Sequence, residues 1–176
     1  MSGPGGYGFE RFCLTAGGLG LLRPAPGTWG SLPPAALAFG MARLGCPVWQ
    51  ISLAMVMLMV AASVATVRFG DLGERIFGKK DPGSVVSDEV AGQALTLVWL
   101  PWGIGFREDV ALAAAGFLLF RILDIVKPPP ARGIQSRHGG WGILLDDLAV
   151  AVYGAVAMSA LAWWWWPGPG VTAAAG

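Results

Sequence analysis

Residues 47–67 form a run of 21 residues that contains no charged side chain. An α-helix needs about 20 predominantly apolar residues to cross the hydrocarbon core of a bilayer. The run therefore predicts a membrane-spanning helix. The rest of the chain agrees, because its mean hydropathy is +0.59 and only 13% of its residues are charged, against about 25% in an ordinary soluble domain. Nine tryptophans fit a protein with two membrane–water interfaces, with a Trp-rich soluble core as the alternative.

Four further apolar segments accompany this run. They cover residues 32–44, 90–106, 110–126 and 142–166. The first is short and contains Arg43, so it either spans the membrane or forms a re-entrant helix. Together the segments predict an all-α fold, a polytopic membrane helical bundle of about four to five hydrophobic helices. The length of 176 residues is enough for one membrane-embedded domain, residues 1–176, and no more.

The ends of the chain and one internal segment are poor in helix signals. Residues 1–16 are Gly-rich and carry no signal-peptide pattern, so we expect a flexible N-terminus, and residues 167–176 a flexible tail. Residues 23–31 are rich in proline and glycine, which predicts a turn-rich loop. Cys13 and Cys46 have neither metal-ligand spacing nor a disulfide framework, and we interpret both as small buried hydrophobes.

Basic side chains are distributed unevenly between the expected loops. The predicted polar loop at residues 68–87 and the segment 127–137 hold most of them. Loops rich in Lys and Arg stay in the cytoplasm of membrane proteins, so this distribution predicts a multi-pass protein with its acidic clusters and active site on the cytoplasmic side. The net charge of +1 indicates no nucleic-acid partner.

Arg121 and Asp124 lie inside an apolar segment. Unpaired at a membrane centre, they would cost on the order of 5–7 kcal/mol together, which nearly cancels the insertion energy of that segment. Three positions apart on a helix, they share a face that Lys127 continues. We therefore expect this polar face to point toward protein. It is either a functional site or an intrahelical ion pair that tolerates burial.

Two acidic pairs, Asp88-Glu89 and Asp146-Asp147, also adjoin apolar segments. Asp88 and Glu89 have a competing structural interpretation, because acids favour the N-terminal turn of a helix. That interpretation is weaker for Asp146 and Asp147, which follow four apolar residues. Adjacent acids repel each other and favour a bound cation, and hard carboxylate oxygens suit Mg²⁺. With the basic residues nearby, the pairs predict metal-assisted phosphate chemistry.

Two further segments are candidates for phosphate contacts. Residues 27–31 could bind phosphate through backbone N–H groups and the hydroxyls of Thr28 and Ser31, although no P-loop pattern follows. His138, the single histidine, lies in a Gly-rich loop and is either a phosphate contact or an incidental polar residue. The clustered carboxylates also leave a small ion or metal transporter open as an alternative.

Four motifs, taken in order, resemble the bacterial phosphatidylglycerophosphatase A family. They are the segments Pro26–Ser31, Asp81–Gly92, Phe120–Pro128 and His138–Asp147. The resemblance covers the chain from about Gly17 to Tyr153. Three residues depart from the family pattern, namely Ser87, Pro129 and Ala151, and none of these departures removes a charged group.

The resemblance implies a helical, Mg²⁺-dependent enzyme of the bacterial cytoplasmic (inner) membrane. Its substrate would be phosphatidylglycerophosphate, a membrane lipid, and its product phosphatidylglycerol. The implied catalytic residues are Asp88, Glu89, Asp124, Asp146 and Asp147, and all of these except Asp124 would be metal ligands. The implied phosphate contacts are Thr28, Ser31, Arg121, Lys127 and His138. Attack by water and a covalent aspartyl-phosphate both remain open, and the sequence does not predict an oligomeric state.

Overall fold

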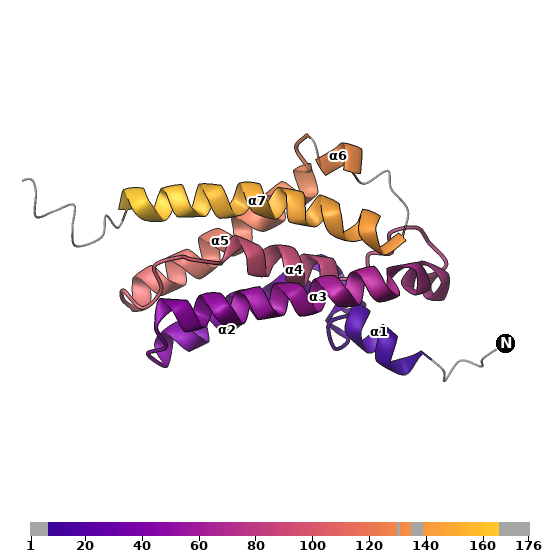
Figure 1. Cartoon of the computed structure of the whole chain (residues 1–176), viewed down its shortest axis with the longest axis horizontal. Coiled ribbons are helices and arrows are strands. Elements are labelled where there is room, and N and C mark those ends of the chain that lie inside the picture. Colours follow the sequence, from indigo (N-terminus) through magenta and orange to yellow (C-terminus); the bar gives the residue numbers. More distant parts are fainter. Residues whose placement is uncertain (1–6, 130, 135–138, 166–176) are drawn as a thin grey trace, which may run out of the picture.

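The computed structural model describes residues 7–129, 131–134 and 139–165. These residues form helices joined by turns, with no strand among them. The elements are α1 (Gly8–Leu14), the 3₁₀ turn η1 (Leu19–Leu21), α2 (Pro26–Arg43), α3 (Val48–Phe77), α4 (Ser87–Thr96), α5 (Phe106–Val126), α6 (Ala131–Ile134) and α7 (Gly139–Trp165). The long helices run along one axis, with the short α4 between α3 and α7 (Figure 1). The predicted all-helical fold is confirmed.

Two helices of the described chain, α3 and α7, are long and apolar enough to cross a membrane, with mean hydropathies of 2.0 and 1.7. The helix α3 contains the predicted span at residues 47–67 except for its first residue, the N-cap Pro47, and it continues for ten residues beyond the span, to Phe77. The prediction of a polar loop from residue 68 was therefore wrong over that stretch. The helix ends where Gly78 adopts a left-handed conformation with φ 64°, a common helix terminator.

A glycine pair sets the packing of α3 against α7. A Cβ atom added to Gly140 would lie 2.3 Å from the carbonyl oxygen of Thr66, and one added to Gly70 would lie 2.4 Å from the Cα atom of Gly140. Small residues at such positions let helix backbones approach closely. This contact brings the first turns of α7, which carry two of the candidate acids, against α3.

The prediction of a loop at residues 23–31 was wrong from Pro26 onward. The helix α2 begins at that proline and runs to Arg43. Proline suits the first turn of a helix because its fixed φ is already helical and its missing N–H has no intrahelical partner there. The segment predicted as a separate helix at residues 32–44 is thus the later part of an 18-residue helix.

The predicted apolar segment 90–106 does not form one helix. The helix α4 occupies Ser87–Thr96, and ten residues span only about 15 Å, half of a hydrocarbon core. It contacts α2, α3, α5 and α7, so its apolar residues are buried by protein. The prediction at residues 110–126 agrees with α5. The expected flexible N-terminus is helical over Gly8–Leu14, and α1 packs on α3.

The ends of α2 and α5 that lie away from the candidate acids are joined by an ion pair. The Arg43 guanidinium lies 3.0 Å from the fully buried Asp109 carboxylate, which also accepts a hydrogen bond of 2.8 Å from the backbone N–H of Gly103. Because the Asp109 carboxylate is paired with Arg43 and with a backbone N–H group, Asp109 has a structural role at that end of the bundle.

Candidate active site

Three of the four predicted metal ligands converge at one end of the bundle. Asp88 and Glu89 lie in the first turn of α4, and Asp147 lies in the third turn of α7. One carboxylate oxygen from each lies within 4.8 Å of the other two. The packing of α4 on α7 therefore brings together acids that are nearly sixty positions apart in the sequence.

Asp146, the fourth predicted ligand, has a different neighbour. The Lys127 ammonium forms a short ion pair with one Asp146 oxygen, and it also lies 3.3 Å from Asp147 and 3.6 Å from Asp124. Burial alone would lower the pKa of Lys127, but the carboxylates of Asp147, Asp146 and Asp124 outweigh it and raise that pKa above its ordinary value. Lys127 is therefore held as a cation beside the acidic cluster.

Arg121 connects the acids to α2. Its guanidinium lies 2.8 Å from the Asp124 carboxylate, so the predicted intrahelical ion pair is present. The same guanidinium donates a hydrogen bond of 3.5 Å to the Ser31 hydroxyl. Its Nε atom is buried without a hydrogen-bond partner, which leaves donor capacity for a ligand. The interpretations of an ion pair and of a functional site are thus compatible.

The first turn of α2 approaches this site closely at Gly27. A Cβ atom added there would lie 2.4 Å from Glu89 Oε1 and 2.9 Å from both terminal nitrogens of Arg121. Any larger residue at position 27 would therefore displace the Glu89 carboxylate or the Arg121 guanidinium from these positions. Thr28 is half-buried in the same turn, and the buried Ser31 hydroxyl donates a hydrogen bond of 2.8 Å to the Gly27 carbonyl.

The carboxylates of the cluster lack partners for several of their oxygens. One oxygen each of Asp88, Glu89 and Asp147 is buried with no hydrogen-bond partner. Burial, followed by the nearby Glu89 charge, raises the pKa of Asp88 well above its usual range. Burial likewise raises the pKa of Glu89 to about 8. Uncompensated buried acids of this kind are costly as anions.

This donor set fits a divalent cation. Mg²⁺ takes oxygen ligands, commonly one or two carboxylates together with water and substrate phosphate, and the three acids offer oxygens that point into one small volume. A cation there would satisfy the orphaned oxygens and offset their mutual repulsion.

The structure draws attention to two further residues near the site. Gln93, one turn after Glu89 in α4, is fully buried, and both polar atoms of its side chain lack partners. Asp81 has a left-handed backbone with φ 46°, and its N–H donates a hydrogen bond of 3.3 Å to the Glu74 carboxylate. Its charge contributes to the raised pKa of Asp88. The sequence interpretation missed Gln93, because a buried amide has no periodic signal. It kept Asp81 only as a weaker candidate, because an Asp before proline is often a turn residue.

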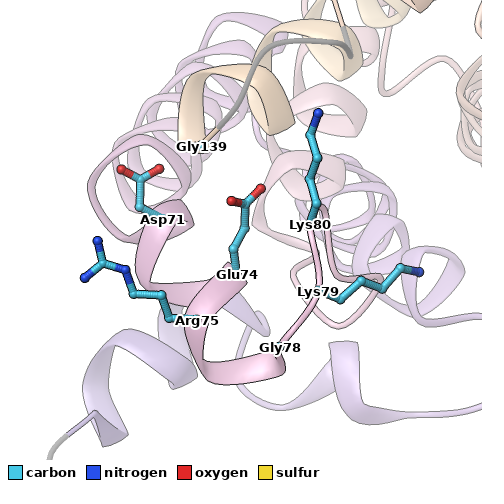
Figure 2. A pocket seen from close by; sticks show the side chains of 7 residues that line it. All are labelled: Asp71, Glu74, Arg75, Gly78, Lys79, Lys80 and Gly139. Carbon is cyan, nitrogen blue, oxygen red and sulfur yellow. The ribbon is translucent and has the colours of Figure 1, made fainter.

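An open polar hollow of about 520 Å³ lies beside the end of α3 (Figure 2). Asp71, Glu74 and Arg75 line it from α3, and Lys79 and Lys80 from the following turn. Asp71 accepts a hydrogen bond of 3.2 Å from the backbone N–H of Gly140. Asp71 and Glu74, the two acids of the hollow, thus hold the start of α7 and the turn at Asp81. The hollow is therefore part of the framework around the carboxylate triad.

The remaining predicted contact, His138, lies outside the described residues, as does the predicted tail at residues 167–176. The other nine predicted site residues belong to α2, α4, α5, α7 or the cap of α5. The structure groups Asp88, Glu89 and Asp147 as a carboxylate triad. Beside this triad lie the two basic residues Arg121 and Lys127, and Asp146 is paired with Lys127.

Comparisons with known proteins agree with this arrangement. The family model of phosphatidylglycerophosphatase A matches residues 12–162. A protein named phosphatidylglycerophosphatase A from Haemophilus influenzae is 34% identical over 149 residues, covering 84% of this chain and 85% of that protein. Its namesake from Escherichia coli is 39% identical over 139 residues, covering 78% and 74%.

A third relative carries a different name. The protein named "Putative phosphatidylinositol-3-phosphatase" from Bacteroides thetaiotaomicron is 31% identical over 149 residues, covering 85% of this chain and 91% of that protein. No solved structure matches the chain.

The apolar helices and the buried acid–base site define the class of this protein: an all-helical, membrane-associated phosphatase. The family match extends over most of the chain, and two relatives of the same name exceed 30% identity. The chain belongs to the phosphatidylglycerophosphatase A family, as its motifs predicted. The alternative of an ion or metal transporter receives no support from these comparisons.

Proposed function

We propose that this protein hydrolyses the terminal phosphomonoester of phosphatidylglycerophosphate, with Mg²⁺ as cofactor, at the cytoplasmic face of the bacterial inner membrane. The observation that carries the proposal is the buried triad of Asp88, Glu89 and Asp147 with Arg121 and Lys127 beside it. The relatives' shared name supplies the substrate.

Each group of residues has a role in this proposal. Asp88, Glu89 and Asp147 hold the cation, which when bound lowers the pKa of water and neutralises charge on the phosphoryl oxygens. Arg121 binds phosphate oxygens with its directed N–H groups, and Lys127 acts as a point charge. The backbone of α2 near Gly27 and the hydroxyls of Thr28 and Ser31 border the same space.

Asp124 and Asp146 have the role of positioning Arg121 and Lys127. Asp124 is paired with Arg121 and lies 3.6 Å from Lys127, while Asp146 is paired with Lys127. They hold the two cations in position when no phosphate is bound. Since the fold places both pairs at the edge of the triad, the phosphate would lie between the metal ligands and the bases.

The proposal is tested by phosphate release from phosphatidylglycerophosphate by the protein purified in detergent. We expect release with Mg²⁺ and loss of release with EDTA. Phosphatidylinositol 3-phosphate serves as the comparison substrate, because one relative is named for it. Equal release in EDTA would refute the cofactor, and faster release from the inositol lipid would refute the substrate.

A further inference from the structure

We propose that an apolar groove between α2 and α5 binds one acyl chain of the lipid whose phosphate lies at Arg121 and Lys127. The inference rests on the proposed function, because it gives the same substrate a second point of contact. It adds a subsite along the bundle, away from the carboxylates.

The groove has a volume of about 300 Å³ and is lined by apolar side chains of both helices. Its lining includes Leu32, Ala36 and Phe39 of α2 and Val110, Ala114 and Phe117 of α5. The small alanines leave space between the larger side chains. A hollow lined only by hydrocarbon and aromatic groups offers no partner for a polar ligand, so its ligand is a hydrocarbon chain.

The groove begins one helical turn from the phosphate end of the site. Leu32 directly follows Ser31, whose hydroxyl accepts the hydrogen bond from Arg121. Phe117 precedes Arg121 by four residues, one helical turn on the same face. A lipid with its phosphate at Arg121 therefore has the mouth of the groove within one turn of its head group.

The distance from Arg121 to the far end of the groove suits an acyl chain. Val110 precedes Arg121 by 11 residues, about 17 Å of helix at 1.5 Å per residue. One leaflet of a bilayer contributes about 15 Å of hydrocarbon, half of a core of about 30 Å. At the far end, α2 and α5 are held together by the ring contact of Phe39 with Phe106 and by the ion pair of Arg43 with Asp109.

A neighbouring hollow provides the control. Ala115 follows Ala114 in α5, is exposed like it, and lines a different apolar hollow of about 260 Å³, shared with α7 near Trp165. That hollow lies at the end of α7 away from Asp147. Tryptophan at position 114 fills the proposed chain groove, whereas tryptophan at position 115 adds the same bulk beside it.

The first test compares Ala114→Trp and Ala36→Trp with Ala115→Trp in detergent micelles. For long-chain phosphatidylglycerophosphate we expect the two groove variants to raise KM about tenfold, the equivalent of about 1.4 kcal/mol of lost binding, with kcat nearly unchanged. A second substrate, the short-chain dihexanoyl phosphatidylglycerophosphate, has acyl chains too short to fill the groove, so its KM should not change. Equal effects of all three variants, or none from the groove variants, would overturn the proposal.

The second test measures binding without turnover. The wild-type protein is irradiated with a phosphonate analogue of the lipid that carries a diazirine midway along one acyl chain. We expect cross-links on α2 and α5 at the groove, suppressed by excess phosphatidylglycerophosphate and not by phosphatidylcholine. Labelling spread evenly over all lipid-facing helices, or suppressed equally by both lipids, would overturn the proposal. Failure of the proposed function would appear separately, as absence of phosphate release from wild-type protein.

Discussion

Asp146 and Asp147 are adjacent in the sequence, yet their side chains have different partners. Asp147 belongs to the carboxylate triad, whereas Asp146 is paired with Lys127. We expect Asp147→Asn to lower kcat by at least about 100-fold and to raise the Mg²⁺ concentration needed for activity, as loss of a metal-site group does.

Asp146→Asn is the matched variant for that comparison. It should mainly raise KM for the lipid, because Lys127 loses its closest carboxylate, and it should leave the Mg²⁺ requirement close to that of the wild type. Phosphate release measured against both Mg²⁺ and lipid concentration separates the two effects. Identical Mg²⁺ dependence of the two variants would contradict the division of roles.

Gln93 in α4 is a buried polar residue whose side chain makes no hydrogen bond. Both polar atoms of its side chain are buried without partners, and each such group costs about 1–3 kcal/mol. We therefore expect Gln93→Leu to raise the thermal unfolding midpoint in detergent. Gln50→Leu, at the half-buried start of α3, should change it less. A lower midpoint for the Gln93 variant would show that the amide is satisfied in the protein.

At the scale of elements, the crossing of α3 and α7 depends on Gly140. A Cβ atom there would meet the Thr66 carbonyl oxygen at 2.3 Å and the Val67 Cα at 2.8 Å, and these backbone atoms cannot move aside separately. Overpacking of this kind typically costs about 1–3 kcal/mol, so Gly140→Ala should unfold at a lower temperature.

Gly40→Ala is the control for that change. Gly40 lies inside α2 with nothing within 4 Å of an added Cβ atom, so alanine should stabilise the protein by about 0.4–1 kcal/mol. Thermal unfolding of both variants in the same detergent provides the comparison. Equal midpoints for the two alanine variants would contradict the close approach of α3 and α7.

The sequence predicted the long helices better than the short ones. Hydropathy and length identified α3, α5 and α7, because uninterrupted apolar runs leave few alternatives. It could not show that α2 starts at Pro26, since a proline-rich segment favours a loop until packing supports its first turn. The sequence could not show that α4 ends at Thr96 either. A segment buried by four neighbouring helices is as apolar as a segment that lies in a membrane.

The candidate site shows the same limit. Charge within apolar sequence directed attention to the acids, three of which the structure brings together. Helical spacing predicted the shared face of Arg121 and Asp124, which form an ion pair. The partition of Asp146 from Asp147 depends on the rotation of α7 relative to Lys127, which no local pattern specifies. The closeness of Gly27 to Glu89 likewise depends on how α2 packs against α4.

At the scale of the whole molecule, the site end of the bundle is expected to face the cytoplasm, because the basic residues collect there. In a chain with Cys13→Ser and Cys46→Ser, we predict that Leu44→Cys reacts with a membrane-impermeant maleimide in intact spheroplasts. Lys79→Cys should react only after the membrane is opened. Both side chains are exposed, and they lie just beyond opposite ends of α3. The reverse labelling pattern would contradict this orientation.

The central claim is that the buried triad of Asp88, Glu89 and Asp147 binds a divalent cation. The most direct test is the binding of Mn²⁺, a spectroscopically visible substitute for Mg²⁺, measured by electron paramagnetic resonance on the detergent-purified protein. We predict saturable binding that Mg²⁺ displaces in the wild type, and loss of that binding in folded Asp88→Asn/Asp147→Asn protein. Equal binding by the wild type and the folded double variant would contradict the claim.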